Sequence, residues 1–437
     1  MIARALTGIA AVGIVTLLAI SWLLSSSPEP VREGLFLVVP WGWARLLAVL
    51  LLLAASLGLG AYLYGRATRP GKASQYAFSM ATHVFLWTVL LLTFYPVVYL
   101  LAVSFNRQNS LAGALPSQGP LLVRSGVLPD PAEFSLVQYQ KVLSQTHILS
   151  YQWLLLALVV AALMGFLVVN LRRRRAGGLG LEKWSSRLGW SAFLLLAALV
   201  VSISPEQFYG VNAAGQRVPA SSERTILLYI RNTLLVSGST GLFAVAICAT
   251  AGYAFARLRF EGRYRTLLVF VFVQMFPAFM ALVAIYYMMS YLDLINTFTG
   301  LILAYSGGAI AFASWIFKGY LESISPSLEE AALVDGATRW GAFVRIILPM
   351  SVPMLLFIFL LQFIGTYSEF ILANTLLVGQ ENWTVGIGLR NFTVGRFDTQ
   401  WGALSASAVL GSLPILVLFY AFQDALTGQY TAGGVKG

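Results

Sequence analysis

The fold of this chain is decided by a short polar stretch between two apolar runs: residues 325–338 read SPSLEEAALVDGAT. Serine and proline at its start favour the first turn of a helix. Four residues follow at the i, i+3, i+4 and i+7 spacing of one helical face: Leu328, Ala331, Ala332 and Asp335. Gly336 suits the turn that ends this helix, and a second short helix is expected through Trp340 and Phe343.

Apolar runs dominate the sequence on both sides of this stretch. Crossing a bilayer takes about 20 helical residues, and about ten runs of roughly that length are present. They lie at 4–24, 43–64, 77–104, 151–170, 189–204, 227–256, 266–290, 299–318, 346–373 and 402–424. The predicted fold class is therefore all-α and polytopic. The first run has a basic start at Arg4 but no small-residue cleavage pattern, so a retained anchor is favoured over a signal peptide.

Composition excludes several classes of protein. The 437 residues are 58% hydrophobic and 10% charged, which is too little charge to cover a soluble domain of this size. The net charge of +11 comes from basic residues beside apolar runs, not from a basic stripe with interleaved aromatics, which argues against nucleic-acid binding. Cys248 is the single cysteine and, with His83 and His147 far apart, no metal site is expected.

The basic residues also predict the orientation in the membrane. They concentrate in alternate loops, after the second, fourth and sixth apolar runs, and such loops face the cytoplasm. The residues concerned are Arg66, Arg69, Lys72, Arg172, Arg173, Arg174, Arg175, Lys183, Arg187, Arg257, Arg259, Arg263 and Arg265. Both termini and the 325–338 stretch are therefore predicted to be cytoplasmic. The run at 172–175 is interpreted as an orientation signal, with a lipid or partner site as the alternative.

Two interpretations of the 325–338 helix follow from its spacing. Alanines on an exposed face are poor surface for water but allow another protein to come close, which indicates a docking element. Alternatively, Ser327 and Glu330 stand three residues apart and could form only a capping box.

This stretch resembles the EAA loop of ABC-importer permeases. Glu330-Ala331-Ala332, then Gly336, then Ile346, Leu348 and Pro349 keep the spacing of that pattern. In that family the loop forms coupling helices that dock into a cleft on each ATPase subunit. The resemblance implies that the docking residues here are Glu330, Ala331, Ala332, Asp335 and Gly336.

Further stretches resemble the maltose/maltodextrin branch of these permeases, the MalG type. They are YAFAR at 253–257, QMFPA at 274–278, KGY at 318–320, DGAT at 335–338 and TAGGVKG at 431–437. In that branch the C-terminal tail reaches the ATPase dimer interface. The resemblance therefore implies ATPase contacts for Gly433, Gly434, Val435 and Lys436.

The resemblance also divides the chain. It implies a six-helix type I permease core, to which this sequence adds about four transmembrane helices as two hairpins. The expected parts are an extra hairpin at 1–75, the first core helix and external loop at 76–147, an inserted hairpin at 148–204, and the remaining core at 205–437. The last part contains the coupling loop at 321–349 and the tail at 425–437. Peripheral packing on the core is expected for both hairpins.

Polar residues in the membrane runs are candidates for the transport path. Glu369 interrupts an apolar run, and a carboxylate at membrane depth usually faces a cavity or a partner. It could instead bond to the partner permease or lie near the external surface. Gln362 and Tyr367 could hydrogen-bond to sugar hydroxyls. In the external loop 379–400, Trp383, Arg390, Asn391 and Phe392 could contact a docked binding protein, unless the loop is an ordinary turn.

The predicted function is that of a permease subunit of an ATP-driven importer for maltose and maltodextrins. The sequence has no GxxxxGK[ST] phosphate loop and no catalytic constellation, so no enzymatic activity is expected. ATP and Mg would belong to two partner ATPase subunits, and sugar would come from an external binding protein through a pore shared with a second permease. Alternatives are the same machine for trehalose or another oligosaccharide, an ion-coupled secondary transporter, and a polytopic membrane enzyme.

Overall fold

A computed structural model describes most of the chain. The described residues are 2–25, 31–33, 36–38, 42–107, 133–143, 148–176, 182–211, 214–215, 217–219, 226–393 and 399–426. They form two compact units, Met1–Ser135 and Leu136–Gly437.

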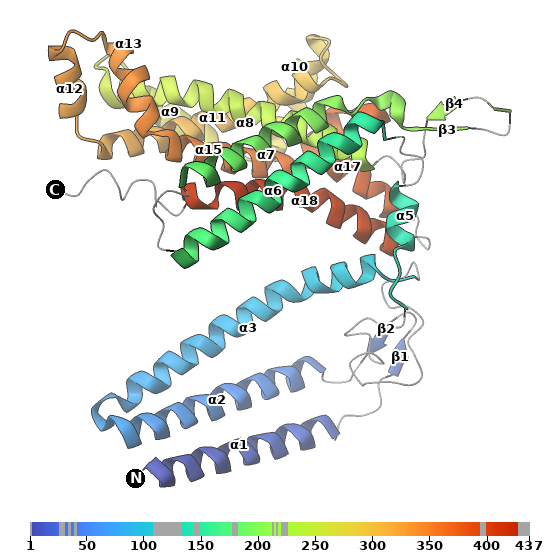
Figure 1. Ribbon diagram of the computed structural model, residues 1–437, viewed down its shortest axis with the longest axis vertical. Helices are drawn as coiled ribbons and strands as arrows, with labels where there is room; N and C mark the ends of the chain where they lie inside the picture. The colour runs from blue at the N-terminus through green and yellow to red at the C-terminus, as the bar shows by residue number, and fades with distance from the viewer. Residues whose placement is uncertain are drawn as a thin grey trace. The chain divides into compact units, whose positions relative to one another are not determined.

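The first unit is built from three long helices packed in sequence order (Figure 1). They are α1 (Ile2–Ser25), α2 (Gly42–Thr68) and α3 (Ala73–Ser104), with a single 3-10 turn, η1 (Pro70–Lys72), between the last two. A two-stranded antiparallel hairpin, β1 (Val31–Glu33) with β2 (Phe36–Val38), lies between α1 and α2. Gly65 allows α2 and α3 to meet, because a Cβ there would lie 2.9 Å from the Tyr76 ring.

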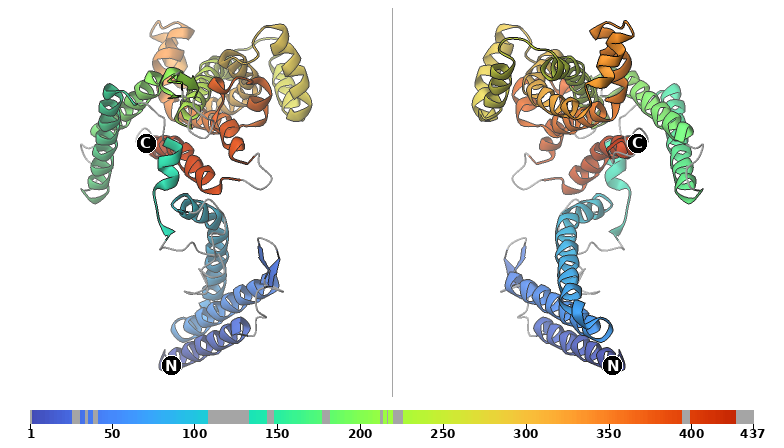
Figure 2. Two further views of the ribbon diagram at one scale, coloured as in Figure 1. Left: turned by 90° about the vertical axis from the view of Figure 1, so that its right-hand side faces the viewer. Right: turned by 90° about the vertical axis from the view of Figure 1, so that its left-hand side faces the viewer.

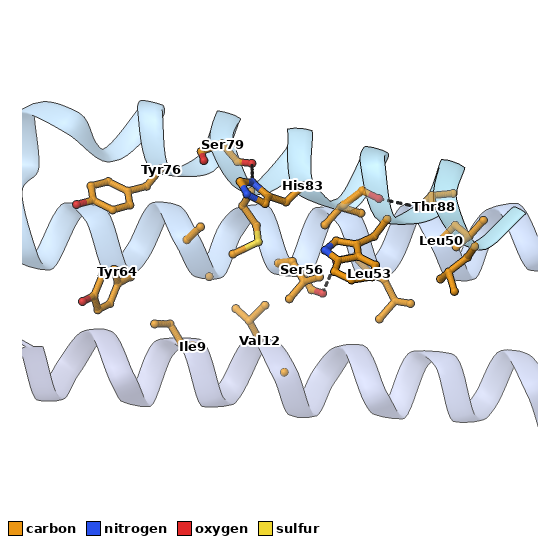
Figure 3. Close-up of a pocket in the computed structure, with 18 residues that line it drawn as sticks. Ile9, Val12, Leu50, Leu53, Ser56, Tyr64, Tyr76, Ser79, His83 and Thr88 are labelled. Atoms are coloured by element: carbon orange, nitrogen blue, oxygen red, sulfur yellow. Dashed lines mark hydrogen bonds between the residues drawn. The ribbon is translucent and has the colours of Figure 1, made fainter. Parts of the chain in front are cut away.

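A groove of about 960 Å³ runs between the three helices of this unit (Figure 3). Its lining is mainly apolar and includes Val12 on α1 and Leu50 and Leu53 on α2. On α3, His83 points into it, and its Nδ1 lies 2.6 Å from the Ser79 carbonyl oxygen in the preceding turn. The histidine is thus paired within its own helix.

The second unit is centred on four long helices. They are α8 (Ile226–Arg257), α11 (Phe298–Ser323), α15 (Val352–Ser368) and α18 (Trp401–Leu426). α8 and α11 pack closely, because a Cβ at Gly252 would lie 2.8 Å from the Phe317 ring and 3.2 Å from the Lys318 backbone nitrogen. Buried apolar residues of α8, α11 and α15, among them Phe317 and Ile358, form the core cluster nearest the 325–338 stretch.

Two of the predicted membrane segments are broken in the structure. The segment at 266–290 divides into α9 (Arg263–Gln274) and α10 (Ala278–Tyr291), because Pro277 between them cannot donate a backbone hydrogen bond. The segment at 346–373 is bent by 71° between 339–350 and 352–368. It then ends before α16 (Ile371–Leu376), so its predicted end was too late.

Outside residues 327–350, the other helices described in the second unit are shorter or peripheral. They are α5 (Val137–Leu143), α6 (Ser150–Ala176), α7 (Glu182–Ser202), η3 (Pro205–Gln207), η6 (Gln380–Asn382), α17 (Val385–Arg390) and η7 (Asn391–Thr393). A second hairpin pairs β3 (Tyr209–Val211) with β4 (Arg217–Pro219). Apart from these two hairpins of three-residue strands, the described chain is helical, as predicted.

The hairpin α6–α7 lies on one flank of the second unit, and α10 lies on the opposite flank (Figure 2). The hairpin packs on α18 through two aromatic pairs, Phe166 with Tyr420 at 5.6 Å and Trp190 with Phe422 at 6.0 Å between ring centroids.

Among the described residues, six helices are long and apolar enough to span a membrane, or seven if the bent pair counts as one span. The six are Leu47–Thr68, Pro70–Ser104, Ser150–Val169, Ile226–Arg257, Phe298–Ser323 and Trp401–Phe422. Shorter apolar helices occur at Thr7–Leu23, Arg187–Ser202 and Met280–Tyr291. Eight of the ten predicted segments thus fall on single helices and two fall on broken ones, and the chain is a multi-pass membrane protein.

Candidate functional site

The 325–338 stretch folds as a short helix that projects from one end of the second unit (Figure 1). This helix, α12 (Ser327–Val334), ends where Gly336 adopts φ of +85°. The Ala337 amide donates to the Ala332 carbonyl at 2.9 Å, and the Gly336 amide donates to the Leu333 carbonyl at 3.1 Å. This pair of bonds is a Schellman motif, which needs a left-handed residue at the position of Gly336.

The chain then returns to the membrane through α13 (Arg339–Ala342), a π-helical turn η5 (Phe343–Ile347) and α14 (Leu348–Met350). Thr338 caps α13 by accepting a hydrogen bond of 3.0 Å from the Gly341 amide. Pro349 has no N–H to close a regular turn, and the widened π-turn lies directly before it. The predicted helix–turn–helix is therefore present.

The outer face of α12 is exposed over most of its length. Glu330, Ala331 and Asp335 are exposed, as predicted for a docking surface, and Val334 is 87% exposed. Trp340 of α13 extends this face and is 64% exposed. Ala332 differs from its predicted neighbours, because it is buried against the rest of the subunit. The predicted face is thus divided between the two sides of the helix.

The capping-box interpretation has no counterpart in the geometry of α12. Its N-cap is Pro326, which makes no side-chain cap bond. The Ser327 hydroxyl lies 2.7 Å from the Ser325 hydroxyl rather than accepting from an amide at the start of the helix. The Glu330 carboxylate is therefore free to face outward from the helix.

Glu329 occupies the inner face of α12 and was not predicted as a site residue. Its Oε1 accepts from Arg257 Nε at 2.6 Å, and its Oε2 accepts from the Tyr253 hydroxyl at 3.1 Å. Both side chains of the ion pair are largely buried, at 11% and 10% exposed. Consecutive helical residues point about 100° apart, so the two adjacent glutamates could not share a face, and this spacing was the available signal.

The predicted path residues lie on and beyond α15. Gln362 is partly buried on that helix, whereas Tyr367 is buried and its hydroxyl donates to the Gly411 carbonyl on α18 at 2.6 Å. Glu369 accepts from the Ile371, Leu372 and Ala373 amides at 2.7, 2.9 and 3.2 Å, and thereby caps α16. The Tyr305 hydroxyl donates to the same carboxylate at 2.5 Å.

The predicted binding-protein contacts lie around α17. Arg390 is exposed and its Nη1 donates to Asn374 Oδ1 at 2.9 Å. Trp383 is partly buried, with its ring centroid 6.1 Å from that of Tyr229. Phe392 is buried at 3% exposure, and only the backbone of Asn391 is described. The three described side chains, of Trp383, Arg390 and Phe392, differ in exposure and do not form one exposed surface. The predicted tail residues at 431–437 lie outside the described residues.

Comparisons with protein families and with curated proteins place this chain among the same inner-membrane permeases. Residues 244–430 match the family described as "Binding-protein-dependent transport system inner membrane component". The maltose/maltodextrin transport system permease protein MalG of Vibrio vulnificus is 33% identical over 373 residues, covering 84% of this chain and 98% of the relative. MalG of Escherichia coli K12 is 42% identical over 218 residues, covering 48% of this chain and 73% of the relative.

A solved structure supports the fold. One chain of a bacterial ABC transporter involved in the import of the acidic polysaccharide alginate superposes with a TM-score of 0.52 at 17% identity. The match covers 80% of this chain and 97% of that chain, and at this identity it bears on the fold alone. The predicted permease architecture is thereby confirmed. This chain belongs to the inner-membrane permeases of binding-protein-dependent ABC importers, in the branch of the MalG sugar permeases, and is a transport component rather than an enzyme.

Proposed function

We propose that this chain is a permease subunit for maltose and maltodextrins. The support is the similarity to relatives named for that transport, which extends over 84% of the chain for the Vibrio vulnificus protein. It would work in the cytoplasmic membrane with a second permease, two ATPase subunits and an external sugar-binding protein. Its termini and α12 would be cytoplasmic, because the clustered arginines flank the loops on that side.

The exposed face of α12 would be the contact with the ATPase. The observation that carries this assignment is the small, exposed surface around Ala331, with Glu330 and Asp335 beside it, on a helix that projects from the unit. Ala332 would act from the inner side, by letting the helix pack closely on the subunit. Gly336 would set the angle of this helix through its left-handed turn. The tail residues Gly433, Gly434, Val435 and Lys436 would provide a second contact.

Transport would follow from movement of this helix. ATP and Mg would be bound by the ATPase subunits, and their closure would push α12 and α13 relative to the membrane helices. The cavity shared with the second permease would then open to the outside and receive sugar from the binding protein. Gln362, Tyr367 and Glu369 are proposed for the path, and Trp383, Arg390, Asn391 and Phe392 for the binding-protein contact.

The test is assembly and transport by the complete importer. This chain is purified from membranes with the partner permease and ATPase encoded beside it, and the bound ATPase is quantified. Glu330→Arg should abolish ATPase capture, since it reverses a charge on the exposed face, whereas Arg390→Ala at the other end of the unit should retain it. Capture by both variants at the wild-type level, or sugar uptake by this chain without an ATPase, would overturn the proposal.

A second measurement identifies the sugar. Vesicles containing the importer are supplied with binding protein and either maltose, maltotriose or trehalose, and ATP hydrolysis is followed. Stimulation by the first two sugars is expected. Stimulation by trehalose alone would support the role as an importer subunit but would contradict maltose and maltodextrins as the substrates.

A further inference from the structure

The inner face of α12 is joined to the membrane core through a single buried carboxylate. Among the eight residues of this helix, only Glu329 and Ala332 are buried. Ala332 contributes one methyl group, which is worth roughly 0.8 kcal/mol of apolar burial at most. Leu328 and Leu333 are 41% and 39% exposed, so the apolar packing of α12 is partial, and the bonds of Glu329 provide the directional link.

The partners of Glu329 belong to the end of α8. Arg257 Nε donates to Glu329 Oε1 at 2.6 Å, and Arg257 Nη2 donates to the Ile324 carbonyl, at the end of α11, at 2.8 Å. Tyr253, one turn earlier on α8, donates to Glu329 Oε2 at 3.1 Å. One arginine thus connects α8, the end of α11 and α12.

Tyr253 also contacts the part of the loop that follows Gly336, formed by α13 and η5. Its ring centroid lies 4.6 Å from that of Phe343, in the π-turn after α13, and Trp340 lies 5.3 Å from Phe343. At this level α8 and α11 cannot slide apart easily, because Gly252 brings Phe317 and the α11 backbone into direct contact. Both arms of the loop are therefore attached to one closely packed helix pair.

A stability role alone does not explain a buried ion pair at this position. Burying two charges costs several kcal/mol of desolvation, and well-packed apolar residues of the same volume often stabilise a fold equally well. What an ion pair adds is a fixed distance and direction between two elements. That property is useful where a displacement of α12 has to be followed by α8.

We propose that Glu329 is a positioning residue that transmits the movement of α12 to the membrane. Through its ion pair with Arg257 and its bond to Tyr253, α12 moves together with the cytoplasmic end of α8. A push on the outer face then displaces α8 and α11 rather than sliding α12 over them. This inference rests on the proposed function, because it assumes that the outer face receives an ATPase.

The experiment measures coupling in the complete importer, reconstituted in vesicles with its ATPase and binding protein. Glu329→Gln keeps the shape of the side chain but removes its charge. We expect the bound ATPase to stay at the wild-type level and the sugar transported per ATP hydrolysed to fall about tenfold, because Arg257 loses its buried counter-charge. The control is Glu261→Gln, which removes an exposed carboxylate from the turn between α8 and α9 and should leave this ratio unchanged.

A double-mutant cycle separates transmission from two independent structural roles. Arg257→Gln alone should lower the transport ratio as Glu329→Gln does, and the double variant should be no worse than either single variant. Arg257→Lys, which keeps the charge, should restore part of the ratio. If Glu329→Gln prevents assembly, Tyr253→Phe replaces it, since this change removes one hydrogen bond and keeps the ring; about a twofold loss is expected.

Three outcomes would overturn the inference. The first is a wild-type ratio of sugar transported to ATP hydrolysed in Glu329→Gln. The second is a loss in the double variant that equals the product of the two single losses, and the third, if Glu329→Gln does not assemble, is a wild-type ratio in Tyr253→Phe. Failure of the unmodified chain to capture an ATPase is a different result, which contradicts the proposed function. The two failures are therefore distinguishable.

Discussion

Two carboxylates at opposite ends of the second unit are used in opposite ways. In the loop between α11 and α15, the Glu330 side chain is exposed on a projecting helix. Beyond the other end of α15, Glu369 accepts hydrogen bonds from three backbone amides and from the Tyr305 hydroxyl. Both glutamates lie near or within apolar sequence, yet Glu330 faces outward whereas Glu369 caps α16 and bonds to Tyr305.

The comparison shows that a polar residue between apolar runs can either satisfy hydrogen bonds within the fold or remain exposed at its surface. In the segment from 369 to 383 the polar groups bond within the fold: Asn296 Oδ1 accepts from the Val378 and Gly379 amides at 3.0 and 2.7 Å, and Asn232 Nδ2 donates to the Glu381 and Trp383 carbonyls at 2.8 and 3.0 Å. The helix α12 instead buries one glutamate and exposes its neighbour. We therefore expect substitutions in the 369–383 segment to lower stability, and substitutions on α12 to lower ATPase capture or transport.

The largest expected effect is that of Glu369→Ala on stability. The change removes the cap of α16 and leaves the Tyr305 hydroxyl without its acceptor, which together cost about 3 kcal/mol. Thermal unfolding of the purified chain in detergent measures this, with Glu330→Ala as the control, which should stay within about 0.5 kcal/mol of wild type. Equal losses in the two variants would break the comparison. Normal stability with lost uptake in Glu369→Gln would favour a path role.

Gly336→Val should have the next largest effect. A β-branched residue at φ of +85° costs about 2 kcal/mol locally, so α12 loses its Schellman turn. Faster proteolytic cleavage within 325–350 and loss of ATPase capture are expected, with little change in global unfolding. Gly336→Asn should behave nearly as wild type, because asparagine tolerates this conformation. Equal behaviour of valine and asparagine variants would mean that the turn is not required.

A smaller effect is expected for Asn296→Ala, again at the end of the second unit that holds Glu369. Asn296 has φ of +60° and its side chain accepts from two amides, so the loss should be about 1–2 kcal/mol. Asn296→Asp keeps the acceptor but turns the Nδ2 donor to Glu381 Oε1, 3.4 Å away, into an oxygen, so we expect recovery of most of this loss for aspartate combined with Glu381→Gln in the same unfolding assay. No recovery in this double variant would indicate that the two accepted hydrogen bonds are not what stabilises this segment.

Arg390→Ala should have the smallest effect on stability, within about 0.5 kcal/mol, because the side chain is exposed. If Arg390 contacts the binding protein, the concentration of binding protein needed for half-maximal ATP hydrolysis should rise. An unchanged requirement would leave Arg390 with only its bond to Asn374.

Much of the architecture could be predicted from the order of residues along the chain. Apolar runs of spanning length predict helices because the bilayer offers no partner to an open backbone group. The break at Pro277 was missed because the runs on either side of it read as one hydrophobic segment, although proline removes a backbone donor. The end of α15 at Ser368 was missed because Glu369 was interpreted as a polar residue within a continuous membrane segment, although its bonds to the Ile371, Leu372 and Ala373 amides are local and begin α16.

The helix at 327–334 shows where local information ends. Its start at proline, its end at Gly336 and its position between membrane runs follow from residue type and spacing alone. Periodicity also separates Glu329 from Glu330 by about 100°, but it cannot say which of them faces the subunit. That choice is made by Arg257 and Tyr253, more than seventy residues earlier, because a charge can be buried only where a distant partner compensates it.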